Sequence, residues 1–173
     1  MLVFLSIILV IIFVLLLFVI LSFFFLAIDV FLDLPYVATR REKIATIIKL
    51  AQIKPGETVI DLGSGDGRLL LASAQKGARA IGYEINPFLV LLTQVRTRRK
   101  SRGEVIIKRQ NLWKANLSIA NVVFVYGRKK TMQKFEDFVY KNAKKGISIV
   151  ANTNPFPNKK PQKIENGIYL YKV

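Results

Sequence analysis

A glycine-rich segment near residue 65 holds the residue types and spacing that point most directly to chemistry. It runs from Asp61 to Gly67 with the sequence DLGSGDG, directly after a short apolar run at residues 58–62. Glycines allow a tight turn there and let a ligand approach the backbone without meeting a side chain. Exposed N–H groups at the start of a following helix favour an anionic group. The segment therefore predicts a binding turn for a nucleotide-type ligand at the carboxyl end of a strand.

A second acidic residue, Glu84, closes the next apolar run, residues 80–83. A carboxylate at the end of that strand can accept hydrogen bonds from both hydroxyls of a ribose. The dinucleotide fingerprint G-x-G-x-x-G is one candidate for such an arrangement. Its third glycine falls on Arg68 in this chain, whose glycines stand instead at positions 63, 65 and 67. The spacing therefore disfavours a dinucleotide site.

The spacing of these glycines, with Asp61 before them and Glu84 after the next strand, resembles motif I of the class I S-adenosylmethionine-dependent methyltransferases. The resemblance implies S-adenosylmethionine (SAM) as cofactor, with Asp61 and the turn at its methionine end and Glu84 at its ribose. It also places adenine contacts after the third strand. Asp66 has a second interpretation, as the cap of the helix that follows. The residues expected to bind the cofactor are Asp61, Gly63, Ser64, Gly65, Asp66, Gly67, Glu84, Ile85, Asn86, Asn111 and Leu112.

A narrower resemblance covers most of the chain. Residues 35–39, 61–68 and 77–87 look like the small membrane-anchored protein-lysine methyltransferases of mitochondria, which modify the c subunit of ATP synthase and the adenine nucleotide translocase. This resemblance implies a protein substrate, a lysine of a membrane protein. The chain departs from the pattern of that family at Ala38 and Asn121, and its residues 128–130 are unusually basic.

The candidates for acting on an acceptor lysine are two tyrosines. The chain contains no histidine, so the usual general base is excluded. Tyr36 and Tyr126 are expected to align the amine, while water removes its proton. For Tyr36, packing of the turn before the domain is the alternative interpretation. Cysteine is absent from the sequence as well, so we expect neither a disulfide nor a metal site.

The elements that must position these residues alternate between strand and helix. We therefore expect an α/β fold, a Rossmann-like class I methyltransferase sheet that is mostly parallel and has a shortened C-terminus. Thr39 stands three residues before Glu42 with capping-box spacing and predicts a helix start. Asn86-Pro87 predicts another. The expected strands are residues 58–62, 80–84, 104–108, 122–126, 147–151 and, antiparallel at the sheet edge, 168–173.

A long apolar segment opens the chain. Residues 1–28 carry no charged side chain, and a helix of about 20 apolar residues spans a hydrocarbon core. We expect a transmembrane anchor at 1–28, a juxtamembrane linker at 29–39 and a SAM-binding methyltransferase domain at 40–173. Cations occur only after the anchor, so the positive-inside rule places the domain in the cytosol. Because no transit peptide precedes the anchor, we expect the cytoplasmic membrane rather than a mitochondrial inner membrane.

The charge of the chain leaves other functions open. Its net charge of +16 comes entirely from the part after the anchor, which attracts anionic lipid headgroups and equally RNA. An RNA methyltransferase and a membrane module that binds SAM without turnover therefore stay as alternatives. Residues 154–157, Asn-Pro-Phe-Pro, look like the motif of enzymes that methylate bases. They follow the fifth strand instead of the fourth, so we interpret them as a rim loop.

Overall fold

The chain forms two compact units in the computed structural model, residues 1–36 and 37–173. The structure describes residues 2–31, 37–98 and 102–173. The first unit is one helix, α1 (Leu2–Phe31), which continues past the expected end of the anchor at residue 28. Its segment Val3–Phe24 has a mean hydropathy of 3.7 and is not buried, so by length and composition it can cross a membrane. Tyr36 lies outside the described residues, as do the other linker residues from 32 to 35.

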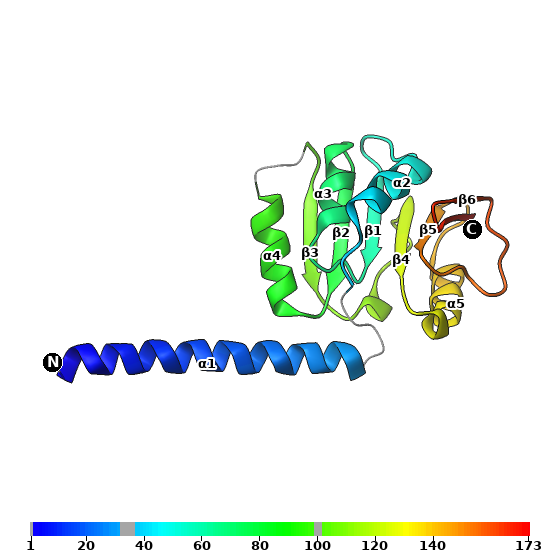
Figure 1. Cartoon of the computed structure of the whole chain (residues 1–173). Coiled ribbons are helices and arrows are strands. Elements are labelled where there is room, and N and C mark those ends of the chain that lie inside the picture. The colour runs from blue at the N-terminus through cyan, green and yellow to red at the C-terminus, as the bar shows by residue number, and fades with distance from the viewer. Residues whose placement is uncertain (1, 32–36, 99–101) are drawn as a thin grey trace. The chain divides into compact units, whose positions relative to one another are not determined.

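The second unit is built on one seven-stranded sheet with the order β3-β2-β1-β4-β5-β7-β6 (Figure 1). The first five strands are parallel, and β7 is antiparallel to both of its neighbours. This confirms the expected α/β sheet. The strands are β1 (Thr58–Leu62), β2 (Arg79–Glu84), β3 (Val105–Arg109), β4 (Val122–Tyr126), β5 (Ser148–Asn152), β6 (Lys163–Glu165) and β7 (Ile168–Lys172).

Three helices lie side by side against this sheet (Figure 1): α2 (Arg41–Ala51), α3 (Arg68–Gln75) and α4 (Pro87–Thr97). The fourth, α5 (Met132–Asn142), connects β4 to β5 in the opposite direction along the sheet. Right-handed crossovers therefore place α5 on the other face. The connection from β3 to β4 contains only a short 3₁₀ turn, η1 (Leu112–Lys114). A second such turn, η2 (Lys129–Thr131), precedes α5.

The core follows from apolar strands that are covered on both faces. Val59 of β1, Phe124 of β4 and Val150 of β5 are almost completely buried and pack with Ile47 and Leu50 of α2. On the other face, Trp113 of η1 packs against the rings of α5, so the loop between β3 and β4 covers part of the area where a helix would otherwise lie.

Two expectations about element ends are wrong. The last strand, β7, is not at the sheet edge, because the short strand β6 pairs with its outer side. The capping box at Thr39 does not form, since α2 begins after Arg40, which makes no side-chain cap within the described residues. The hydroxyl of Thr39 instead accepts from Asn152 at 3.5 Å. Tertiary contacts at the end of β5 have replaced the local cap.

Candidate functional site

The site lies where the order of the strands reverses. The chain runs outward from β1 to β2 and β3, and then returns to β4 on the other side of β1. Such a switch point opens a crevice at the carboxyl ends of the strands, where open α/β sheets bind ligands. The turn 63–67 follows β1 there, Glu84 ends β2, and Tyr126 ends β4. The topology therefore brings together the segments predicted to bind the cofactor and the acceptor.

The turn after β1 is held against β2 by backbone hydrogen bonds. The N–H groups of Gly63 and Ser64 both donate to the carbonyl of Tyr83, at 3.0 and 3.1 Å. Gly63, Gly65 and Gly67 all have positive φ, which glycine adopts without steric cost. At Gly67 a Cβ would also collide with the side chain of Thr93 on α4. These contacts explain the glycine spacing and keep the turn close to the sheet.

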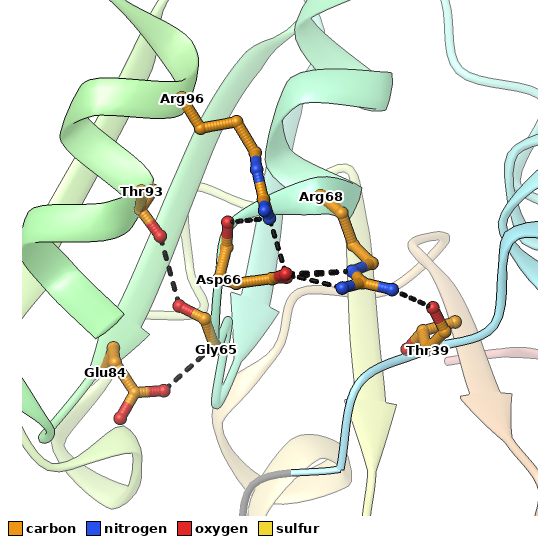
Figure 2. Close-up of polar contacts among 7 residues, drawn as sticks. All are labelled: Thr39, Gly65, Asp66, Arg68, Glu84, Thr93 and Arg96. Atoms are coloured by element: carbon orange, nitrogen blue, oxygen red, sulfur yellow. Dashed lines mark hydrogen bonds and ion pairs between the residues drawn. The ribbon is translucent and has the colours of Figure 1, made fainter. Parts of the chain in front are cut away.

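Glu84 and Thr93 hold the Gly65 peptide from two sides (Figure 2). The buried carboxylate of Glu84 accepts from the N–H of Gly65 at 2.9 Å and from that of Asn86 at 2.8 Å. The Thr93 hydroxyl donates to the carbonyl of Gly65 at 3.1 Å. A carboxylate has about four acceptor positions, so these two bonds are compatible with further bonds to a ribose diol. Glu84 therefore faces the turn, and its contact with a ribose stays a prediction.

Asp66 does not cap the following helix, because the N-cap of α3 is Gly67. Its buried carboxylate forms ion pairs with Arg68 of α3 and Arg96 of α4, each at 2.5 Å. Arg68 also donates to the carbonyl of Thr39 at 2.6 Å, which ties the segment before α2 to the turn (Figure 2). Burial alone would raise the pKa of Asp66, but the hydrogen bonds and charges of the two arginines lower it to about 2. The carboxylate therefore holds the turn in place, and its contact with a cofactor stays a prediction.

The pKa of Asp61 is shifted in the opposite direction from that of Asp66. Its side chain is buried at the end of β1, and burial together with repulsion from Glu84 and Asp66 raises its pKa to about 7. Such a carboxyl gains more from a nearby cation than an exposed one does. A ligand that carries an ammonium group fits this position, as the expected role of Asp61 at the methionine end of SAM requires.

The hydroxyl of Ser64 is buried and has no hydrogen-bond partner among the described residues. It points under the turn toward Gly82 and Leu70, because a Cβ at Gly82 would collide with both side chains. The side chain of Ser64 is therefore turned away from the ligand side of the turn, and a contact of its backbone with the cofactor stays a prediction. This arrangement also explains the glycine at position 82, which the sequence interpretation had missed.

The residues expected near the adenine lie beside the turn. Leu112 of η1 is close enough to Gly63 that a Cβ there would stand 3.6 Å from it. The side chains of Asn86 and Asn111 each accept from a backbone N–H two residues on, at 3.0 Å, and so cap α4 and η1. The cap at Asn86 is confirmed. Ile85 is half-buried between these segments, and its adenine contact and that of Asn111 stay predictions.

The predicted acceptor side, at the end of β4, lies beside a segment that sequence reasoning had not assigned to the site. Tyr126 is half-buried at the end of β4, and Asn154 donates to the carbonyl of the next residue, Gly127, at 2.8 Å. Thr153 has φ 72°, which is unusual for a β-branched residue and occurs mainly at constrained positions. Its hydroxyl donates to buried Asn152 at 3.0 Å. The run at 154–157 therefore begins in the turn after β5, and its first residue, Asn154, links this turn to the end of β4.

The fold and the site together define a class I methyltransferase. An RNA methyltransferase from Salinibacter ruber, solved with S-adenosyl-L-homocysteine, superposes with a TM-score of 0.75 and 25% sequence identity over 79% of this chain and 94% of that chain. A family model described as the ANTKMT methyltransferase domain matches residues 61–163, and the chain belongs to this family. The expected cofactor class, SAM, is thereby confirmed for the domain.

Two curated relatives share the same region. The lysine N-methyltransferase of the ATP synthase c subunit from Homo sapiens is 31% identical over 132 residues, covering 76% of this chain and 56% of the relative. Adenine nucleotide translocase lysine N-methyltransferase of Mus musculus is 35% identical over 132 residues, covering 75% of this chain and 57% of the relative. The chain thus spans a little over half the length of these relatives.

Proposed function

We propose that the protein is a SAM-dependent protein-lysine methyltransferase, tethered by α1 and acting on a lysine of a membrane-associated protein. One observation carries the cofactor half of this proposal: Glu84 and Thr93 hold the turn 63–67 in place. The turn follows Asp61, a buried carboxyl whose pKa is raised to about 7. The two relatives named for lysine methylation support the acceptor half.

In this proposal each residue of the cofactor half binds a different part of SAM. Glu84 accepts from the ribose hydroxyls, Asp61 faces the ammonium group, and Leu112 with Ile85 covers the adenine. When bound, SAM would supply the methyl group, carried on a sulfonium that would leave as a neutral thioether when the lysine nitrogen displaces it in line. Because such a displacement depends mainly on positioning, the rigid turn is the chief contribution of the chain.

The acceptor half aligns the amine. Tyr126 and the carbonyl of Gly127 lie at the end of β4, braced by Asn154 from the end of β5. The amine must lose a proton before it attacks, and we propose that water takes it while Tyr126 and Tyr36 orient the nitrogen. The sequence offers no histidine for this step.

The tether keeps the site near a bilayer. Between the end of α1 at Phe31 and the start of α2 at Arg41, an extended chain reaches at most about 35 Å. A short loop of another membrane protein would lie within that range. The positive-inside rule favours the cytosolic side of the cytoplasmic membrane, with a mitochondrial inner membrane as the alternative.

The test is to incubate full-length protein with radiolabelled SAM and membranes from its own source. We expect one labelled protein band whose label survives nuclease and solvent extraction and is absent with Glu84→Gln. Label that nuclease removes would support the RNA alternative, and label that solvent extracts would indicate a lipid acceptor. Cofactor binding in a calorimeter without any labelled acceptor would support the module that binds SAM without turnover. Alkaline extraction of the membranes tests the anchor separately.

A further inference from the structure

One surface of the second unit exposes apolar side chains without a partner in the described chain. On α4, Leu91, Leu92 and Val95 are 58%, 43% and 68% exposed. A groove of about 520 Å³ separates this helix from the edge strand β3, with Val105 and Ile107 in its wall. We call α4 together with this side of β3 the α4–β3 face. Exposed apolar groups gathered on one helix of a soluble domain indicate an interaction surface.

The charge of the α4–β3 face has one sign. The sequences of α4 and β3 contain no acidic residue. Exposed Arg98 follows α4 and lines the groove. Arg109 is exposed on β3, and it lies on the same side as Val105 and Ile107 because strand side chains alternate. An apolar stripe with cations at its borders is the pattern of helices that lie in the interface of an anionic bilayer.

The inner side of α4 is already engaged, which separates the two surfaces of the helix. Thr93 bonds to Gly65, and Arg96 pairs with Asp66 of the turn (Figure 2). The outward stripe at 91, 92 and 95 makes none of these contacts. The α4–β3 face is therefore free to meet a surface while the cofactor turn stays in place.

We propose that the α4–β3 face docks onto the anionic surface of the membrane that α1 spans, so that this face of the domain is turned toward the headgroups. This inference rests on the proposed anchoring of α1. The occupant is a lipid surface because the face combines insertable apolar side chains with cations alone, and because the short linker keeps it within reach of headgroups.

The chain contains no cysteine, so single cysteines report on single positions. Full-length V95C and I164C, each labelled with an environment-sensitive fluorophore, are reconstituted into vesicles of phosphatidylcholine with or without phosphatidylglycerol. Ile164 is the matched control, since it is 59% exposed and lies on β6 at the opposite edge of the sheet. We expect the V95C label in anionic vesicles to shift to the blue and become about threefold less accessible to iodide, because interfacial helices insert by 5–10 Å. The I164C label should stay aqueous.

Further variants test the apolar side chains and the cations of the α4–β3 face separately. Leu91→Gln with Leu92→Gln, and independently Arg98→Gln with Arg109→Gln, should each abolish the shift at V95C without changing SAM affinity. High salt should also reverse it. An aqueous V95C label on protein that resists alkaline extraction would overturn the docking proposal while leaving the anchor intact. A shift that follows protein density instead of anionic lipid would mean that a second copy covers the face, and would also overturn it. If alkaline extraction releases the protein from the membrane, the result would contradict both the anchoring by α1 and this docking proposal.

Discussion

The two halves of the proposed site occupy the same edge of one sheet and are held by different kinds of contact. The cofactor half, after β1 and β2, is fixed by bonds of the Gly65 backbone to Glu84 and Thr93 and by the pairing of Asp66 with two arginines. The acceptor half, after β4 and β5, is fixed by side chains from distant segments, such as Asn154 on the carbonyl of Gly127. The first arrangement is centred on one glycine-rich turn and suits a constant ligand. The second can vary with the substrate, because function resides in sites that are added to a shared fold.

The strongest test of this division compares one residue from each half. Glu84→Ala should weaken SAM binding about 100-fold, since each hydrogen bond to a charged group contributes about 1.5–3 kcal/mol and the variant also releases the N–H of Gly65. Asn152→Ala, on the acceptor half, should leave the dissociation constant for SAM nearly unchanged but slow methylation. Titration calorimetry and a methylation assay measure both. Equal losses of SAM affinity in the two variants would show that the halves are not separate.

The second test removes the ion pairs under the turn. Asp66→Asn should lower the free energy of unfolding by about 2 kcal/mol, less than for a fully buried pair, because both arginines are partly exposed. The folded pKa of Asp66, about 2, lies below its ordinary value of 3.8. Its contribution is therefore present above pH 3.8 and is lost as the pH falls toward 2. Denaturant unfolding against pH measures this.

The control for that test is Glu104→Gln, which removes an exposed ion pair with Arg79. It should leave the free energy of unfolding nearly unchanged, since exposed pairs contribute little. A loss in this control as large as in Asp66→Asn would mean that general surface charge, and not the turn, determines the effect.

The third test uses the raised pKa of Asp61, which is about 7 against an ordinary value of 3.8. Between these values the folded protein holds a proton that the unfolded chain has lost, so stability falls as the pH rises from about 4 to about 7. A cofactor ammonium favours the ionised carboxylate. SAM affinity should therefore rise with pH, by up to about tenfold per unit below 7, and level off above.

Asp61→Asn should make SAM affinity nearly independent of pH in this range. The proton released on binding can be followed by calorimetry in buffers of different ionisation enthalpy. An unchanged pH dependence in the variant would assign the titration to another group. Variants of the acceptor half should keep the slope, because Asp61 is unchanged in them.

The same division explains what the sequence could predict. The glycine spacing, Asp61 and Glu84 all fall within one strand–helix–strand unit, so these parts of the cofactor half were predictable. The roles of Arg68, Arg96 and Thr93 were not, because they depend on how α4 packs against the turn. The available signal was that Thr93 and Arg96 stand three residues apart in the helix predicted after Glu84.

The acceptor half was less accessible still. Asn152 and Thr153 matter only through pairing of β5 with β4 and with the segment at Thr39. The spacing of neighbouring residues in the sequence does not predict such long-range contacts. For the same reason the expected cap at Thr39 was wrong: a local pattern was overridden by a tertiary partner.

The smallest expected effect concerns the strained residue of the acceptor half. Thr153→Gly should raise the free energy of unfolding by about 1 kcal/mol or less, because relief of a positive φ is offset by the added flexibility of glycine. Gln52→Gly is the matched control, since Gln52 also has a positive φ, of 49°, but lies at the end of α2. Both variants should be slightly stabilised, whereas only Thr153→Gly should slow methylation, because it also loses the hydroxyl that bonds to Asn152. Thr153→Ser keeps that hydroxyl and should retain most of the rate. If the glycine variant at 153 methylates at the normal rate, the end of β5 is only a structural turn and the acceptor half reduces to β4.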